Sequence, residues 1–452
     1  MHLGRSSEPA QKWGATSLAP AARGRNSNNA TVSCDADWNA TMGSLKRSAL
    51  APKSFPRVSG IAGVALKTAR AGIKSAGRDD LLLVTLDRGT TVAGVFTRSA
   101  TASAPVQWSR KVAASGKARA ILINSGNANT FTGAQGVADV RSTAAMAAHT
   151  AGCRSSDVLI ASTGVIGEPL PVNRIENALL RVQSSRRTAS WLDAARAIGT
   201  TDTYPKGATR RTCIGDTEVS LSGIAKGSGM IAPDMATMLA FIFTDAKLPA
   251  PVLRALLKEG IRTSFNCITV DSDTSTSDTV LLAATGQAAN RSPQSVTAPQ
   301  LKAFRAALKE LLTDLAVQVV RDGEGASKFI TVDVSGAASS AEARKAALAI
   351  ANSPLVKTAI AGEDANWGRI IMAVGKSGAR LFQHRLAISI GGITITDGGE
   401  RVPSYDEDEV TTHLKGTDIS IAVDLGVGRS RSRVWTCDLT HDYIRINADY
   451  RT

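Results

Sequence analysis

The chain has 452 residues, of which 43% are hydrophobic and 20% are charged. This length and composition are those of a globular protein with a large core, and no apolar run approaches the roughly 20 residues that cross a bilayer. The formal net charge is +14, but aromatic residues make up only 4% and no dense Lys/Arg run appears. The sequence therefore argues against a membrane-spanning segment and against a nucleic-acid partner.

The cysteines are scattered, and none forms a C-x-x-C pair. Their number is odd, which argues against a disulfide framework, and their spacing argues against a zinc site. They are Cys34, Cys153, Cys213, Cys267 and Cys437. We therefore expect a reducing, cytoplasmic location and no bound metal.

Residues 1–41 differ from the rest of the chain because they are rich in Ser, Asn and Arg and lack a periodic apolar pattern. Such a segment is predicted to be disordered. Met42 is a candidate for the natural start, which would make residues 1–41 a non-native extension. An organelle transit peptide is the less favoured alternative.

From residue 60 onward, alternating apolar patterns and helical periodicity succeed one another. Strands are predicted at residues 81–86, 91–96, 120–123, 158–161, 209–214, 218–224, 238–243, 280–284, 329–334, 386–390, 393–396 and 419–423. Helices are predicted at residues 137–150, 173–182, 188–198, 251–264, 299–321 and 341–351. Many strands mixed with helices, without a regular βαβ rhythm, predict an α+β layered architecture.

Residues 225–243 carry the clearest chemical signal. A Gly- and Pro-containing loop with Lys226 runs into Thr237, and a buried-strand pattern follows at once at residues 238–243. If the bond from Ala236 to Thr237 is cut, Thr237 gains an α-amino group with a pKa of roughly 7.7–8.0. Thr with its own amine is a known pair of nucleophile and base. The plain alternative is an ordinary loop before a buried strand.

Several blocks in order along the chain resemble the ornithine acetyltransferase family (glutamate N-acetyltransferase of arginine biosynthesis). The first block is the loop at residues 226–239. The others are residues 124–129, 161–167, 201–203, 271–278, 322–326 and 362–368, and the C-terminal tail. The resemblance covers roughly residue 50 to the C-terminus.

This resemblance implies a sandwich of two β-sheets flanked by helices, like that of N-terminal-nucleophile enzymes. It also implies self-cleavage between Ala236 and Thr237. The products would be an α chain of residues 42–236 and a β chain of residues 237–452, which stay together and pair into an α2β2 heterotetramer.

The implied reaction is transfer of an acetyl group from N-acetylornithine to glutamate through an acetyl ester of Thr237. By resemblance, Thr163 and Gly164 stabilise the oxyanion, although an ordinary strand-end turn also fits them. Residues expected to contact substrate are Thr203, Lys226, Thr237, Glu324, Asn447 and Thr452. Lys226 suits a carboxylate and Glu324 an ammonium, although residues 322–325 also make a good turn.

No cofactor is expected, and acetyl-CoA as a second acetyl donor is left open. The alternative is a related self-processing aminopeptidase or amidohydrolase, in which water resolves the acyl enzyme.

Overall fold

The computed structural model describes residues 46–73, 77–232 and 238–448. The chain divides into residues 1–39, which lie outside this described part, and residues 40–452, which hold every element below. The predictions for residues 1–41, Ala236, Thr237 and Thr452 therefore fall outside the described residues. In the described part, no helix is long and apolar enough to cross a membrane.

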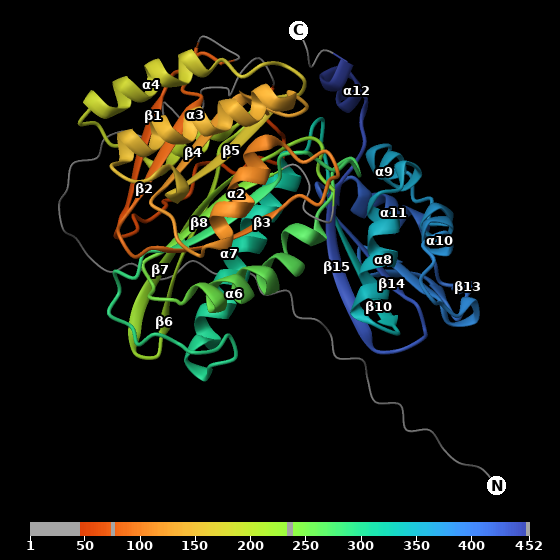
Figure 1. Cartoon of the computed structure of the whole chain (residues 1–452). Helices are drawn as coiled ribbons and strands as arrows, with labels where there is room; N and C mark the ends of the chain where they lie inside the picture. Colours follow the sequence, from red (N-terminus) through yellow and green to blue (C-terminus); the bar gives the residue numbers. More distant parts are fainter. Residues whose placement is uncertain (1–45, 74–76, 233–237, 449–452) are drawn as a thin grey trace, which may run out of the picture. The chain divides into compact units, whose positions relative to one another are not determined.

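The first sheet has four strands in the order β1-β2-β4-β5 (Figure 1). They are β1 (Val64–Ala69), β2 (Leu81–Leu86), β4 (Ala120–Asn127) and β5 (Val158–Val165). Neighbours are antiparallel except β4 and β5, which run parallel. One face packs on two helices, α3 (Gly133–Ala151) and α4 (Val172–Ser184).

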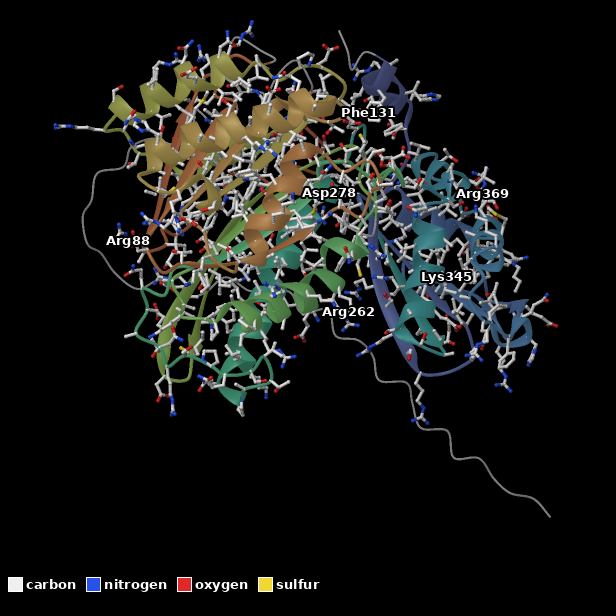
Figure 2. All side chains as sticks on the ribbon, viewed as in Figure 1. Arg88, Phe131, Arg262, Asp278, Lys345 and Arg369 are labelled. Atoms are coloured by element: carbon white, nitrogen blue, oxygen red, sulfur yellow. The ribbon has the colours of Figure 1, made fainter. Side chains whose placement is uncertain are left out.

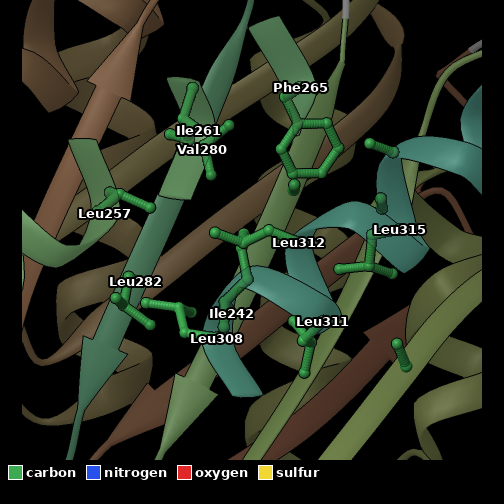
Figure 3. Close-up of a cluster of buried hydrophobic side chains, with 14 of the residues drawn as sticks. Ile242, Leu257, Ile261, Phe265, Val280, Leu282, Leu308, Leu311, Leu312 and Leu315 are labelled. Atoms are coloured by element: carbon green, nitrogen blue, oxygen red, sulfur yellow. The ribbon is translucent and has the colours of Figure 1, made fainter. Parts of the chain in front are cut away.

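The second sheet has five strands in the order β3-β9-β8-β7-β6. They are β3 (Thr91–Phe96), β6 (Lys206–Ile214), β7 (Thr217–Lys226), β8 (Leu239–Thr244) and β9 (Thr279–Ala284). Strands β8 and β9 run parallel, and the other pairs are antiparallel. Two helices cover one face, α6 (Ala250–Arg262) and α7 (Lys302–Arg321) (Figure 3).

Strand β8 is buried on both faces, which explains why its sequence is a continuous apolar run. Successive side chains of a strand point to opposite faces. Ala240 and Ile242 therefore join the core beneath α6 and α7, whereas Phe241 and Phe243 join the core between the two sheets. Fully burying an apolar side chain of this size stabilises the fold by about 1.5–3 kcal/mol. A strand buried on both faces has no polar alternation to show.

The inner faces of the two sheets meet in one apolar cluster, which includes Leu82 and Ile121 from the first sheet and Leu281 from the second. Two further helices pack at this cluster, α2 (Ala104–Ala114) and α5 (Trp191–Ile198). The layers are thus helices, sheet, sheet and helices. This arrangement confirms the predicted α+β sandwich of two sheets flanked by helices.

A third sheet lies in the C-terminal part, and the sequence did not predict it as a separate layer. Its order is β13-β12-β11-β14-β10-β15. The strands are β10 (Phe329–Ala337), β11 (Ala387–Ile390), β12 (Ile393–Asp397), β13 (Glu400–Arg401), β14 (Asp418–Asp424) and β15 (Ser430–Cys437). Helices of this part are α8 (Ser340–Ala351), α9 (Pro354–Ala361), α10 (Gly368–Gly375) and α11 (Glu407–Leu414), which share an apolar cluster with the sheet.

The remaining elements are short. Helix α12 (His441–Ala448) ends the described part, where the sequence indicated only a tail. Single 3₁₀ turns lie at Ser155–Asp157, Phe265–Cys267, Pro299–Leu301 and Gln383–Arg385.

Candidate active site

The loop that holds the predicted cleavage site is anchored at both ends by neighbouring strands. Lys226 ends β7 and pairs with Leu239, the first residue of β8. The Met238 amide donates a 2.9 Å hydrogen bond to Asp278, and the Met238 carbonyl accepts one of 3.1 Å from the Thr279 amide. The residue directly after the predicted nucleophile is therefore fixed by two bonds to the β9 end.

The predicted oxyanion residues lie at the end of β5, beside Lys226. The Lys226 ammonium donates a 3.1 Å hydrogen bond to the Thr163 hydroxyl, and the two residues are only 3% and 4% exposed. This bond joins the end of a strand in the first sheet to the end of a strand in the second. The two sheets thus bring together residues that lie 63 positions apart in the sequence.

Gly164 is required by the close approach of β4 to β5. Its φ of 133° lies in the region that favours glycine. A Cβ at this position would lie 2.2 Å from the carbonyl carbon of Gly126 and 2.5 Å from the Asn127 nitrogen. Both neighbours are backbone atoms, so neither can move without shifting β4.

We predict that Gly164→Ala lowers the free energy of unfolding by about 1–3 kcal/mol, because it combines strained backbone with overpacking. Activity should fall as well, since the Thr163 backbone must move with it. Urea denaturation measures the first effect. Gly167→Ala is the matched control, because Gly167 also has a positive φ of 83° but nothing within 4 Å of its Cβ position. Equal stability of the two variants would contradict the role of the close approach.

Lys226 is a buried cation with spare hydrogen-bond donors. Burial lowers the pKa of its ammonium, and this effect is partly offset by the negative charges of Asp202 and Glu324. An ammonium has three donors, and the described residues account for one bond, to Thr163. The side chain can therefore donate to a carboxylate or carbonyl oxygen that enters beside it.

A buried ion network supports the loop from below. The Lys206 ammonium bonds Asp202 and Asp322, each at 2.5 Å, and all three side chains are at most 2% exposed. Asp202 also accepts a 2.7 Å hydrogen bond from the Gly227 amide. The network thus ties the residue after Lys226 to the interior.

The charged groups of this network shift one another's pKa values. Burial would raise the pKa of Asp202, but the positive charges of Lys206 and Lys226 hold that pKa well below its usual range. Burial raises the pKa of Asp322 to about 6, against the attraction of Lys206. Asp202 is therefore the carboxylate that stays ionised beneath the loop.

Thr203 belongs to the same network. Its hydroxyl donates to Asp322 and accepts a 2.9 Å hydrogen bond from the Ser48 amide, while its own amide donates to Asp322 at 2.9 Å. These bonds occupy the hydroxyl that was expected to contact substrate. The substrate contact of Thr203 stays a prediction.

Glu324 and Asn447 approach the loop from the C-terminal part. The Glu324 amide donates to the Ser228 carbonyl at 2.9 Å, and a Cβ on Gly229 would lie 2.4 Å from the Glu324 carboxylate. The Asn447 side-chain amide donates to that carboxylate at 2.9 Å. The structure therefore brings both residues to the loop that follows Lys226.

In the described ranges, no group of three or more His, Cys, Asp or Glu side chains is arranged to hold a metal ion. The site consists of hydroxyl, ammonium, carboxylate and amide groups. These groups suit acyl transfer by a nucleophile with hydrogen-bonded oxyanion stabilisation.

A family model for the ArgJ family matches residues 65–452. This chain belongs to the ArgJ family. The predicted resemblance to the ornithine acetyltransferases is confirmed by this match and by the curated relatives.

Two curated ArgJ-family relatives are named "Arginine biosynthesis bifunctional protein ArgJ". The one from Mesorhizobium japonicum is 54% identical over 408 residues, which cover 90% of this chain and 99% of the relative. The one from Brucella suis is 53% identical over the same shares. A crystal structure of the Bacillus halodurans protein of that name is 44% identical, with a TM-score of 0.44, and covers 45% of this chain and 95% of the other.

Sequence reasoning assigned no role to several charged residues that surround the 227–238 loop, among them Lys206, Asp322, Asp271 and Asp278. Lys206 begins a strand that carries no motif. Asp322 begins the family block 322–326, in which only Glu324 was assigned a role. Asp271 and Asp278 end the polar segment 271–278, which the sequence marked as a family block without assigning roles. The sequence signal that could have identified Asp271 and Asp278 was the presence of a carboxylate at each end of a polar turn.

Asp271 holds the loop at Met230 and Ile231. Its carboxylate accepts hydrogen bonds from the Met230 amide at 2.6 Å and the Ile231 amide at 2.9 Å. Burial raises the pKa of this carboxyl to about 6, although the amide bonds act in the opposite direction. Met230 has a positive φ of 53°, so Asp271 stabilises a turn that few non-glycine residues adopt.

Proposed function

We propose that this chain is a self-cleaving acetyltransferase that moves an acetyl group from N-acetylornithine to glutamate through an acetyl ester of Thr237. The curated relatives are named for arginine biosynthesis, and their matches cover 90% of this chain. The observation that carries the proposal is the bond from Lys226 to Thr163 beside the anchored ends of the 227–238 loop. This bond joins the Lys226 ammonium to the proposed oxyanion residue Thr163 beside the two ends of the loop whose sequence contains Thr237.

Self-cleavage begins when the Thr237 hydroxyl attacks the Ala236 carbonyl carbon. An N-to-O acyl shift gives an ester, and water hydrolyses it. The products are an α chain ending at Ala236 and a β chain starting at Thr237. We expect the two chains to remain associated and to pair into an α2β2 heterotetramer in the cytoplasm.

Acetyl transfer uses the new chain end. The Thr237 hydroxyl attacks the acetyl carbonyl of N-acetylornithine while the α-amine accepts its proton and passes it to the leaving ornithine nitrogen. The amine of glutamate then attacks the acetyl ester, which is a ping-pong scheme. Thr163 and Gly164 stabilise the oxyanion of both steps, and each such donor is worth about 2.7–4 kcal/mol of barrier.

Substrate recognition needs one partner for the α-carboxylate and one for the distal ammonium of ornithine. Lys226 is suited to the carboxylate because it is buried and has donors to spare. Glu324, with Asn447 and Thr452, is suited to the ammonium. Acetyl-CoA as a second donor fits the word "bifunctional" in the relatives' names, and it would use the same Thr237 ester.

A two-product assay tests this function directly. Incubation with N-acetylornithine and glutamate should yield ornithine and N-acetylglutamate in equal amounts. Release of acetate at the rate of ornithine formation would contradict the proposal and favour the hydrolase alternative, in which water resolves the acyl enzyme.

We predict that Glu324→Gln lowers kcat/KM for N-acetylornithine by about 10- to 100-fold, because one charge-assisted hydrogen bond contributes about 1.5–3 kcal/mol. Glutamate has no distal ammonium, so transfer from the preformed acetyl enzyme to glutamate should change much less. Single-turnover measurement of the two half-reactions separates these effects. Glu310→Gln is the control, since the Glu310 side chain is 66% exposed. An equal loss in both half-reactions would contradict this assignment of Glu324.

A further inference from the structure

Self-cleavage, as proposed above, lacks the proton acceptor that acetyl transfer uses. Before the Ala236–Thr237 bond is cut, the nitrogen of Thr237 is an amide and cannot act as a base. Another group must accept the hydroxyl proton during the first attack. This inference rests on the proposed function and concerns that missing group.

Asp278 is the titratable residue tied most directly to this point of the chain. It precedes β9, which runs parallel to β8 with Leu239 opposite Thr279. Its Oδ1 accepts the 2.9 Å hydrogen bond from the Met238 nitrogen. That nitrogen is covalently bonded to the carbonyl carbon of Thr237. Asp278 therefore contacts the amide nitrogen that directly follows the predicted nucleophile in the chain.

The second oxygen of the Asp278 carboxyl has no hydrogen-bond partner among the described residues. Oδ2 is buried and has no hydrogen bond from any described residue. The Thr97 hydroxyl lies close enough to lower the pKa of this carboxyl, but it donates its proton to the Ser275 carbonyl at 2.6 Å. A buried, unpaired carboxyl oxygen costs roughly 1–3 kcal/mol or more. Such a group calls for an explanation beyond folding.

The surroundings of Asp278 make it a stronger base than an exposed carboxylate. The residue is fully buried, in contrast to the exposed Arg262 and Lys345 (Figure 2). Burial raises the pKa of its carboxyl well above the usual value, while the Met238 amide, the charge of Lys226 and the Thr97 hydroxyl act in the opposite direction. Lys226, at the end of β7, is the charged group of the described residues that acts on it. A base is most effective when its pKa lies near the working pH.

We propose that the Asp278 carboxylate accepts the Thr237 hydroxyl proton during self-cleavage and returns it to the Thr237 nitrogen. The hydroxyl oxygen forms a bond to the Ala236 carbonyl carbon as its proton moves to Asp278. The bond from that carbon to the Thr237 nitrogen then breaks, and the nitrogen takes the proton to become a neutral amine. The ester is hydrolysed by water. From that moment the amine is the base, so acetyl transfer no longer needs Asp278.

The test separates cleavage from turnover. Wild-type and Asp278→Asn full-length chains are made by cell-free translation, and the two fragments are followed over time on denaturing gels at several pH values. Asn keeps the acceptor for the Met238 amide but cannot take a proton. Cleavage of the variant should slow by at least about 100-fold, the lower end of general-base contributions. Wild-type cleavage should accelerate as the pH rises and the carboxyl ionises, and the variant should lack this dependence.

Turnover per cleaved chain provides the second readout. The fraction of Asp278→Asn that does split should transfer acetyl groups at close to the wild-type kcat. Asp278→Glu, which restores a carboxylate, should split faster than Asp278→Asn. The matched control is Asp245→Asn at the opposite end of β8, where Asp245 likewise accepts a backbone amide, that of Ser220 at 2.8 Å. It should split at the wild-type rate.

Three results would overturn the inference while leaving the proposed function intact. Asp278→Asn could split at the wild-type rate, its cleavage could keep the wild-type pH dependence, or its cleaved fraction could lose turnover as severely as cleavage. The last result would make Asp278 a structural residue for both steps. A wild-type chain that never splits would instead remove the proposed function and this inference together.

Discussion

The Thr237→Ala variant is expected to remain one uncut chain with no acetyl transfer. It lacks the hydroxyl that attacks Ala236, and it lacks the free amine that cleavage would create. Loss of a nucleophile of this kind lowers turnover by on the order of 10⁶-fold in a well-studied protease, so the measured rate should fall to background. Denaturing electrophoresis and an ornithine-release assay on the same preparation check both outcomes.

Thr237→Ser is the matched control, because it keeps a hydroxyl and yields a free amine on cleavage. It should split and turn over at a measurable rate. The assignment of Thr237 would fail if the Ala variant split like wild type. It would also fail if the uncut Ala variant transferred acetyl groups at a comparable rate.

The second large effect is on stability. Lys206→Met should lower the free energy of unfolding by about 3–5 kcal/mol, because it leaves Asp202 and Asp322 buried with their shared cation gone. Met has a similar length and can fill the space, so the loss comes from the two uncompensated carboxyl groups. Urea denaturation followed by circular dichroism measures it.

This substitution should also disturb the site, since Asp202 holds the Gly227 amide. Slower self-cleavage is expected in the fraction that folds. Lys345→Met serves as the control, because Lys345 is exposed and bonds only the Gly378 carbonyl, at 3.1 Å, among the described residues. A change of less than about 1 kcal/mol for Lys206→Met would place it in the range of a surface ion pair and contradict the buried network.

The sequence predicted the sandwich well where strands are buried on both faces. The runs at β2, β4 and β8 are continuous and apolar, and the structure has strands at each of them. It failed at β15, whose sequence begins Ser-Arg-Ser-Arg and whose first half is partly exposed. An edge strand with charged residues lacks the pattern that marks a core strand, so β15 was missed although β10, β11, β12 and β14 of the same sheet were predicted as strands.

From the sequence, candidate site residues could be named only within the segments that resemble the family. The structure places Thr163 against Lys226 and Asn447 against Glu324, and their roles stay predictions. Lys206 and Asp322 could not be paired from sequence. They lie 116 positions apart, and neither segment contains a sequence pattern that predicts a buried ion pair. Asp278 was visible only as the end of a polar turn. That its second carboxyl oxygen is buried without a partner among the described residues follows from the packing of the interior.

Everything proposed for this chain depends on Thr237 becoming a chain end that carries the acetyl group. The intact mass of the purified wild-type protein, before and after addition of N-acetylornithine, tests this most directly. The account predicts two fragments that part between Ala236 and Thr237, with one acetyl group added to the C-terminal fragment. A single unbroken chain that turns over substrate at full speed, or an acetyl group on the other fragment, would contradict it.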